Sequence, residues 1–477
     1  MIDPLVERYA TPEMAAIWDP AETLARQRKL WVGVLGSQID VGATEDPDGK
    51  LFASYAQLDI DLVAGRKYRD EGSQTKEQML LGVRYSEYRR AIAEAEQRTR
   101  HDLKAHLEVF DQLAGGHGKL HLGLTSADIT EAVSQGQVVS AAWLTGLRMH
   151  SALDRLSGLA QTHKELVLTG RTHNVPAQAV TLGIRFARCA EEMMLALERL
   201  DTVIRQPTRL PCGAVGTHAD TLAVLGQTAG QSVDAFDDDD RMIATGQNYH
   251  RSMDWDAASA LIQTAMGPAS LAVTLRLMAG HALLNEGHAT GQVGSSAMPH
   301  KVNPRMAERI QGLQHVVRGY AQMIQSTGGN TWNEGDVSDS VVRRVALPGM
   351  FLAIDGLLRT FCYLLDHLKI DEGAIAQELF NHSERLASGA VLAGLVRQGV
   401  PREQAHTRLR AWYSGEGEYD GEFSKVVTRE AQRVRSTPPG LSVLQVQKVC
   451  ARIEQAQQCL PEVHRRAMLA WEPGVVL

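Results

Sequence analysis

Residues 125–161 read TSADITEAVSQGQVVSAAWLTGLRMHSALDRLSGLAQ, and this stretch decides the fold class. Ser126 is a candidate N-cap, and the acidic Asp128 follows it closely, as is common where a helix begins. The apolar residues beyond it recur every three or four positions, which is the spacing of one helix face. The pattern predicts roughly nine turns of continuous helix.

The spacing of the prolines permits further long helices. Proline is costly inside a helix, and the chain has long proline-free gaps between residues 47 and 176, 211 and 268, and 348 and 401. Strand signals are nearly absent, and aromatic residues make up only 5% of the chain. We therefore predict an all-α fold around a central long-helix bundle. Besides the stretch above, helical periodicity predicts helices at about 77–110, 177–205, 252–285, 304–326 and 347–368.

Two loop-like breaks divide the chain. AGGHGKLHLG (residues 114–123) precedes the long central helices, and LKIDEG (residues 368–373) follows them. These breaks predict an N-terminal helical domain over 1–123, a central bundle over 124–369 and a C-terminal helical domain over 370–477.

Composition narrows the class of protein. The chain of 477 residues has a net charge of −7, which argues against a general nucleic-acid binder. The five cysteines show no C-x-x-C spacing, so free thiols are expected rather than disulfides or a zinc site. The N-terminus lacks a signal-like apolar segment, and no run of eighteen apolar residues appears. We expect a cytoplasmic protein that does not span or bind a membrane.

Several polar stretches could carry chemistry, although each also has a structural explanation. His101 could simply cap a helix, and Thr125 with Ser126 could be a loop and N-cap. His117 and His121 have the spacing of a helical zinc pair, but the glycines around them argue against a helix, so no metal is expected. The other stretches are GRTHNVPAQ (170–178), which could be a turn between helices, GQNY (246–249), and WNEGDVSDSVVRR (332–344), whose hydroxyls and arginines could grip a phosphate or form a capping box.

The stretch GSSAMPHKVNP (residues 294–304) is the most specific of these motifs. It lacks the sequence and the strand–turn–helix setting of nucleotide-binding loops. It resembles the signature of the fumarase/aspartase superfamily of elimination lyases, within the branch that acts on succinylated purine ribotides. Matching motifs lie in order along residues 8–348: RYATPEM, RHD, HLGLTSAD, GRTHNVPAQ, GQNY, the signature and DSVVRRVALP.

This resemblance implies a three-domain, nearly all-α subunit whose central helices assemble into a homotetramer. Each active site would then be built from three subunits. It also implies release of fumarate from a succinylated purine ribotide, without a metal or an organic cofactor. The partners implied are a small-molecule substrate and copies of the same chain, with no nucleic acid and no membrane.

The resemblance also implies catalytic roles. Ser295 would be the base that removes a carbon-bound proton, and Lys301 with Asn303 would stabilise the carboxylate that gains charge. His173 would be the general acid for the leaving nitrogen, and Glu286 would orient it. Flexible backbone at Gly287, Gly291 and Gly294 would let the signature segment close as a lid.

Substrate binding is implied at further positions of the same motifs. Thr125, Ser126 and Gln247 would hold the succinyl carboxylates. His101 would contact the phosphate or position the substrate, with Asp102 beside it. The remaining residues, which would bind the nucleotide phosphate and its surroundings, are Arg8, Tyr9, Arg309, Ser340 and Arg344.

One position departs from the family pattern. An arginine is expected five residues before Ser340, where this chain has Gly335. Either another basic residue such as Arg343 fills this role, or the anion that is bound differs. Sister lyases acting on argininosuccinate, on a carboxymuconate or on another aminosuccinate are therefore alternatives, and an inactive helical scaffold is a second one.

Overall fold

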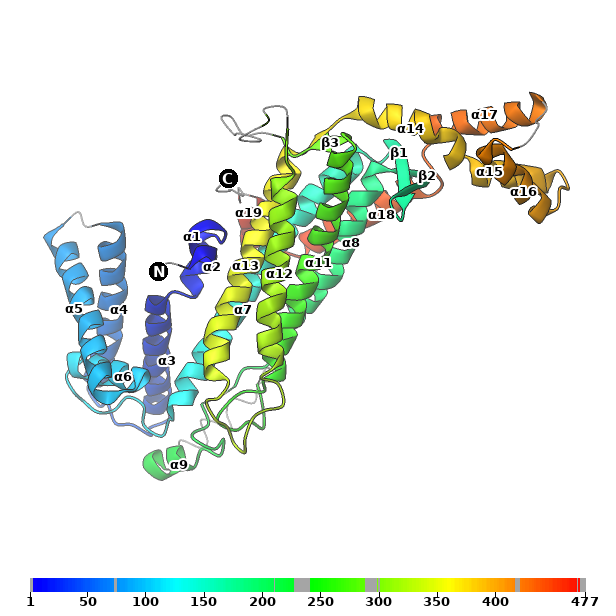
Figure 1. The fold of residues 1–477 in the computed structure, drawn as a ribbon. Helices are drawn as coiled ribbons and strands as arrows, with labels where there is room; N and C mark the ends of the chain where they lie inside the picture. Colours follow the sequence, from blue (N-terminus) through cyan, green and yellow to red (C-terminus); the bar gives the residue numbers. More distant parts are fainter. Residues whose placement is uncertain are drawn as a thin grey trace.

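The computed structural model describes residues 3–72, 75–209, 211–226, 241–287, 298, 301–416, 421–469 and 471. Five long helices lie side by side and form an elongated central bundle (Figure 1). The predicted all-α fold with a long-helix centre is confirmed. The bundle consists of α7 (Ser126–Thr162), α8 (Leu182–Ile204), α11 (Ser252–Gly280), α12 (Arg305–Gln325) and α13 (Ser340–His367).

Helix α7 runs for 37 residues and begins one residue earlier than predicted, because Thr125 and not Ser126 is its N-cap. The side chain of Thr125 accepts the backbone N–H of Asp128, the third helical residue. The Asp128 carboxylate in turn accepts the Thr125 N–H at 2.8 Å. This capping box satisfies amides that a helix start otherwise leaves unpaired. At a rise of 1.5 Å per residue, α7 is about 55 Å long, so it spans the whole bundle.

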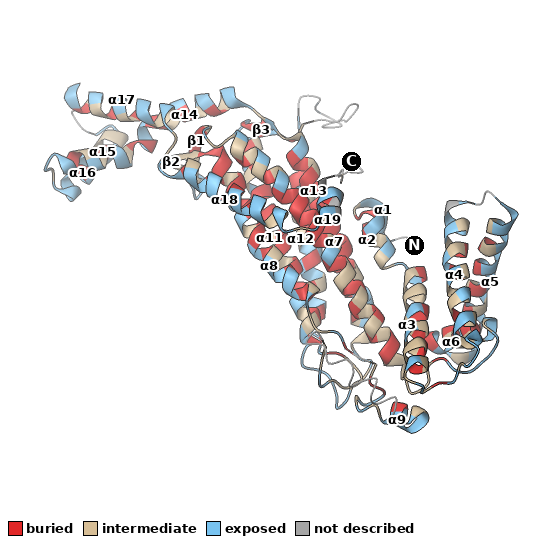
Figure 2. Cartoon of the chain, turned by 180° about the vertical axis from the view of Figure 1, so that it is seen from behind, coloured by how far each residue is buried: buried red, intermediate tan, exposed pale blue. Residues whose placement is uncertain are grey.

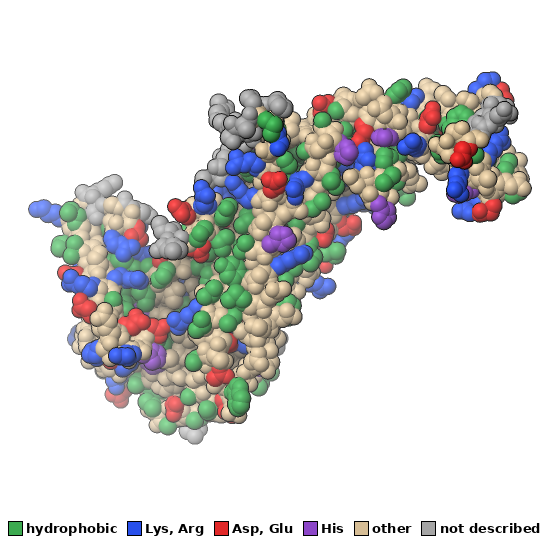
Figure 3. Space-filling model, viewed as in Figure 1, with side chains coloured by type: hydrophobic (Ala, Val, Ile, Leu, Met, Phe, Trp, Pro, Cys, Tyr) green, Lys and Arg blue, Asp and Glu red, His purple; other side chains and the backbone are tan. Residues whose placement is uncertain are grey.

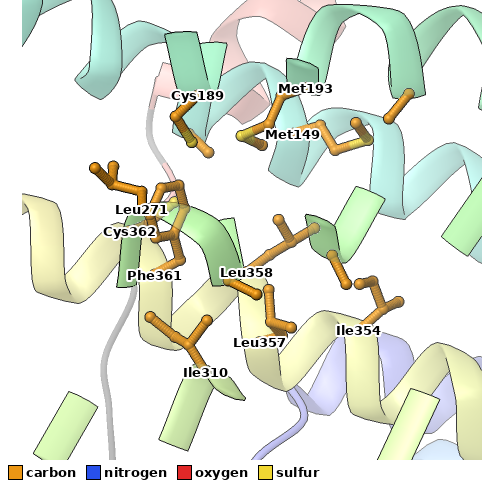
Figure 4. Packing of buried hydrophobic residues seen from close by; sticks show 14 of the residues in the cluster. Met149, Cys189, Met193, Leu271, Ile310, Ile354, Leu357, Leu358, Phe361 and Cys362 are labelled. Atoms are coloured by element: carbon orange, nitrogen blue, oxygen red, sulfur yellow. The ribbon is translucent and has the colours of Figure 1, made fainter. Parts of the chain in front are cut away.

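The apolar faces of the bundle helices meet in one core. Figure 4 shows Met149 of α7, Met193 of α8, Leu271 of α11, Ile310 of α12 and a row of residues from α13 pointing toward one another. Figure 2 shows buried residues along the inner faces of these helices and exposed residues on the outer ones. Burial of a large apolar side chain contributes about 1.5–3 kcal/mol, so this core dominates the stability of the bundle.

Helices α11 and α13 are long and apolar enough to cross a membrane by length and composition, with mean hydropathies of 1.2 and 1.5. Neither helix contains an uninterrupted apolar run of eighteen residues, so the sequence predicts no membrane span. Most of each apolar window, 61% and 83%, is buried inside the protein. Both helices are central members of the bundle, and their apolar character is that of core helices.

The sequence did not predict a β-hairpin, and the structure contains one. Strands β1 (Val167–Thr172) and β2 (Val175–Thr181) pair antiparallel at the end of the bundle where α7 ends, so the predicted helix from residue 177 starts only at Leu182. His173 and Asn174, which join the strands, have φ values of 51° and 60°. Two successive residues of positive φ are the requirement of a tight type I′ hairpin turn. A second short pair joins β3 (Leu284–Asn285) to β4 (Lys369–Ile370).

The N-terminal helices pack around a core of their own that includes Trp31, Tyr55 and Phe110. The predicted helix 77–110 is broken, because Arg100 takes a left-handed φ of 52° and His101 caps a new helix. Helices α3–α6 stand beside one end of the bundle (Figure 1). Their bounds, with those of α1 and α2, are α1 (Pro4–Arg8), α2 (Pro12–Ile17), α3 (Pro20–Asp40), α4 (Lys50–Glu71), α5 (Lys76–Thr99) and α6 (Asp102–Leu113).

The C-terminal helices project from the opposite end of the bundle, except that α18 and α19 return along it (Figure 1). A small core that includes Leu409, Phe423 and Val427 holds the projecting helices together. Four cysteines are buried free thiols and Cys459 is an exposed one. The remaining helices are α9 (Ala219–Leu225), α14 (Glu372–Leu386), α15 (Ser388–Arg397), α16 (Arg402–Ser414), α17 (Gly421–Ser436), α18 (Ser442–Gln458) and α19 (Glu462–Leu469).

A buried ion network joins three bundle helices near the start of α7. The Glu131 carboxylate receives Arg251 Nη1 at 2.6 Å and Arg343 Nη1 at 3.1 Å, and Arg343 Nε also reaches Asp254 at 2.7 Å. Burial alone would raise the pKa of Glu131, but the charges of Arg343 and Arg251 hold it below its usual value. Glu131 is therefore ionised and balances two buried guanidinium groups.

We expect Glu131→Gln to lower the free energy of unfolding by about 3–5 kcal/mol, because it leaves buried arginine charge without its counter-ion. Glu94→Gln is the matched control, since Glu94 faces Arg90 on the surface at 3.7 Å and an exposed pair contributes about 0–1 kcal/mol. Urea unfolding of both variants measures the difference. Equal stability of the two would show that the network does not hold the helices together.

Buried histidines should make stability depend on pH. Burial lowers the pKa of His150 to about 4, and burial with the charges of Arg28 and Arg89 lowers that of His106 far below its usual value. Below about pH 6.5 these two histidines bind protons in the unfolded chain but stay neutral in the folded chain. The free energy of unfolding therefore falls as pH falls. We expect a smaller free energy of unfolding at pH 5.5 than at pH 7.5. His150→Leu should reduce that difference, whereas the exposed His315→Gln should leave it unchanged.

Candidate functional site

One group of predicted site residues meets where α6, α7 and α13 begin. His101 Nδ1 accepts the Lys104 N–H at 3.4 Å, and its Nε2 lies 3.2 Å from Ser126 Oγ. Arg344 Nη2 lies 3.0 Å from Asp102 Oδ2. We call this group, with Thr125, Gln247 and Ser340, the α7-start group.

The buried Asp128 holds the Thr125–Ser126 turn in place. Its carboxylate accepts the backbone N–H of Thr125 and of Cys212, and it lies 2.9 Å from the guanidinium of Arg209. Arg209 in turn donates to the carbonyl of Gly246, directly before Gln247. One buried carboxylate thus fixes both the start of α7 and the loop that carries Gln247.

Gly335 is required by its surroundings. Its φ of 144° lies in a region that side chains rarely adopt, and a Cβ there would stand 2.9 Å from the Gln247 Cβ. The neighbouring loops are tied by the Gln247 N–H, which donates to the Glu334 carbonyl, and by Asn248 Nδ2, which donates to the Asp336 carbonyl at 2.8 Å. An arginine at this position would displace the backbone.

Arg343 does not replace the missing arginine. All three of its guanidinium nitrogens are engaged inside the protein, with Asp254, Glu131, Ser134 and the Tyr249 hydroxyl. Arg344, the next residue, is two-thirds exposed and is the arginine that faces outward. The first of the two explanations suggested by the sequence, that Arg343 fills the role, is therefore wrong.

The α7-start group borders a cavity of about 500 Å³ between the N-terminal helices and the bundle. This volume is within the range of small-molecule sites. Asp102, Ser340 and Arg344 line it, and Arg89 of α5 adds a positive charge that the motifs did not indicate. The wall of the cavity also includes the buried pair Glu131 and Arg343.

A second group gathers at the start of α12, which we call the α12-start group. The Glu286 carboxylate accepts the N–H groups of Met306 and Ala307, each at 2.8 Å, and so caps the helix. Burial raises the pKa of Glu286, although these two amides oppose the shift. Lys301, which is exposed, and the half-buried Asn303 precede the same helix end.

Basic side chains surround this helix end. Burial lowers the pKa of Arg309, and the neighbouring charges of Arg305, Arg8 and Arg359 lower it further, while Tyr9 lies under its guanidinium with 5.6 Å to the ring centroid. Figure 3 shows blue basic side chains collected at this upper end of the bundle. The positive charges of these arginines repel one another, so binding an anion among them would be favourable.

Arg359 belongs to this cluster and was missed from the sequence. It donates to the carbonyl groups of Tyr9 and Ala10 and so ties the N-terminal segment to α13. A lone arginine within the apolar run of α13 was the signal that could have identified it.

Part of the predicted site lies outside the described residues, namely Ser295, Gly291 and Gly294. Gly287 is described, and it is not the free hinge that the sequence suggested. Its φ is 68°, and a Cβ there would stand 2.5 Å from the His367 carbonyl oxygen. Glycine is needed at this position for a close backbone approach rather than for motion.

His173, the predicted general acid, lies at the opposite end of α7 from the α7-start group. It occupies the exposed tip of the β1–β2 hairpin. Both oxygens of Glu286 are used by α12, and among the described hydrogen bonds none joins Glu286 to His173. The two residues are not paired within one chain.

The predicted residues therefore occupy separate places on the chain. The α7-start group and the hairpin lie at opposite ends of α7, about 55 Å apart along the helix. Ser340 and Glu286 lie at opposite ends of α13, because Gly287 packs against His367 at its far end. At 28 residues, α13 separates them by about 42 Å.

Several characterised proteins are similar to this chain over most of its length. The adenylosuccinate lyase of Saccharomyces cerevisiae is 27% identical over 85% of this chain and 81% of its own. The adenylosuccinate lyase of Synechocystis is 28% identical over 90% and 93% of the two chains. That of Bacillus subtilis is 27% identical over 85% and 87%.

Solved structures share the fold. A fumarate lyase from Mesorhizobium superposes with a TM-score of 0.69 at 18% identity, over 93% of this chain and 98% of its own. The 3-carboxy-cis,cis-muconate lactonizing enzyme of Pseudomonas putida superposes with a TM-score of 0.73, also at 18% identity, over 95% and 99%. The sequence profile of a family described as lyase matches residues 74–319, just over half of the chain. The chain belongs to this lyase family, within the fumarase/aspartase superfamily, and is a lyase.

Proposed function

We propose that this lyase releases fumarate from adenylosuccinate, giving AMP, and from succinylaminoimidazole carboxamide ribotide, giving AICAR. The similarity to adenylosuccinate lyases over at least 85% of the chain supports this substrate class. Two groups of cationic and hydroxyl side chains support it as well, because the substrate carries carboxylates at one end and a phosphate at the other. The role would be in purine nucleotide biosynthesis.

The proposed reaction is a β-elimination. A base, Ser295, takes the proton from the carbon beside a carboxylate, and the electron pair left on that carbon forms the new double bond as the carbon–nitrogen bond breaks. His173 gives a proton to the departing nitrogen. Lys301 and the helix start it precedes would stabilise the extra negative charge on the carboxylate. Thr125 and Ser126, held by Asp128, would orient the succinyl group.

Assembly from several copies is part of the proposal, and one observation carries it. The α7-start group is kept about 55 Å from the hairpin that carries His173 by α7, and about 42 Å from Glu286 of the α12-start group by α13. A nucleotide-sized substrate cannot touch groups so far apart on one chain. Bundles that pack against one another in opposite directions would bring the three parts together, so we propose a homotetramer with shared sites.

Gly335 favours a second candidate substrate. Without an arginine there, the α7-start group offers Arg344 and Ser340 to a distal anion, and Arg344 is already paired with Asp102. A lyase for argininosuccinate or for another aminosuccinate would not need a phosphate site. Fumarate is the product of these reactions too, so only the rest of the substrate differs.

A substrate panel tests the assignment. We expect purified protein to release fumarate, seen as an absorbance change, from adenylosuccinate and not from argininosuccinate, and to form no lactone from a carboxymuconate. Arg344→Gln should raise KM for adenylosuccinate more than it lowers kcat, because it removes binding of the distal anion. Turnover of argininosuccinate alone would refute the proposed substrate and leave the lyase chemistry intact.

Mixing inactive variants tests the shared site. Ser295→Ala and His173→Gln should each lose most of kcat while keeping the fold. After equal mixing and subunit exchange, about a quarter of the sites should carry neither change if the two residues come from different chains. Mixing Ser295→Ala with the double variant is the control and should stay inactive. Absence of recovery in the first mixture, despite demonstrated exchange, would contradict a site shared in this way.

A further inference from the structure

A polar cavity of about 510 Å³ lies behind the β1–β2 hairpin, between the start of α8 and the end of α11. Its lining includes Thr169 and Gln178 of the hairpin, Arg185 and Arg188 of α8, and Thr274 of α11. All of these residues belong to one chain. His173 is not in the lining, although its neighbours Thr172 and Asn174 are.

The cavity is positively charged. Arg171, Arg185 and Arg188 line it, whereas the lining contains a single carboxylate, that of Glu192. Arg171 is paired at 2.6 Å with Glu378, which lies outside the lining. Within the described chain, Arg185 and Arg188 form no ion pair, and the single protein hydrogen bond of Arg185 goes to the Thr169 carbonyl at 3.3 Å.

Burial lowers the pKa of Arg185 to about 10, and the nearby charges of Arg188 and Arg171 lower it further, against the attraction of Glu378. The group is still protonated at neutral pH. A guanidinium ion that is half-buried beside two others, with one carbonyl as its partner, has most of its donors free for an anion.

One of the lining residues, Thr169, carries a buried hydroxyl. Thr169 is only 1% exposed, and its Oγ1 has no hydrogen-bond partner in the protein. A buried hydroxyl left without a partner costs about 1–3 kcal/mol, so such groups are rare unless something else binds them. The backbone of Thr169 is held in the β-ladder opposite Ala179, which also lines the cavity.

We propose that this cavity is a binding site for a small organic anion that carries a carboxylate or phosphate group. Arg185 and Arg188 would grip the anionic oxygens, and the Thr169 hydroxyl would donate to one of them. The volume exceeds that of a bare inorganic ion and is within the range of small-ligand sites. The site does not include His173, and its occupant would brace the hairpin that presents this residue.

Calorimetric titration of the intact protein with succinate and, separately, with inorganic phosphate tests the site. We expect one of the two probes to bind saturably at constant ionic strength, and Arg185→Gln to weaken that binding about tenfold or more. Arg199→Gln is the matched control, because Arg199 is an exposed arginine on the same helix, outside the cavity lining. It should bind like the wild type. The probe that binds identifies the anionic group.

Thr169→Val provides a second test that does not change charge. It should weaken the same probe severalfold while leaving the unliganded melting temperature unchanged or higher, because it removes a buried hydroxyl that has no protein partner. Three results would overturn the proposal: no saturable binding of either probe, equal affinity in Arg185→Gln and Arg199→Gln, or a changed mass of the assembly in Arg185→Gln without loss of binding. A changed mass of the assembly would mean that the cavity is where another copy of the chain packs.

Discussion

The length of α7 is the constraint on which the remaining structure depends. Its 37 residues hold the Thr125–Ser126 turn at one end of the bundle and the β1–β2 hairpin at the other. A rigid rod of about 55 Å cannot fold back to bring its ends together. The motifs at the two ends of α7 are therefore far apart on the chain, and the proposed reaction, which uses both, would need more than one copy.

The helices of the bundle could be predicted because their signal is local. Periodic apolar residues without helix breakers, with an N-cap expected at Ser126, were enough to place the start of α7 to within one residue. The hairpin could not be predicted in the same way. Its strands carry mixed polar and apolar residues, and its turn depends on positive φ values at His173 and Asn174, which are not glycine. The predicted helix 77–110 breaks for the same reason, because Arg100 takes a positive φ although it is not glycine.

For the candidate site too, the sequence predicts features that depend on neighbouring residues but not contacts between residues far apart in the chain. The motifs named most of the polar residues that gather at the two helix starts, since each motif surrounds a cap or a turn. They did not indicate which groups meet, because that depends on contacts such as Arg344 with Asp102, 242 positions apart. Arg343 illustrates the limit: the sequence suggests that it binds an anion, whereas in the structure it is a buried part of the cavity wall whose three guanidinium nitrogens already bind four protein side chains.

Gly335 leaves the α7-start group without one expected positive charge, and in the proposed assembly a second copy of the chain would supply it. The α7-start group has a paired Arg344, but the α12-start group holds Arg8, Arg305, Arg309 and Arg359 close enough to lower the pKa of Arg309. If opposed bundles bring these two groups to one site, the second supplies more positive charge than a single arginine at position 335 would. The glycine then serves the tight contact with Gln247, and its presence is compatible with an anionic substrate.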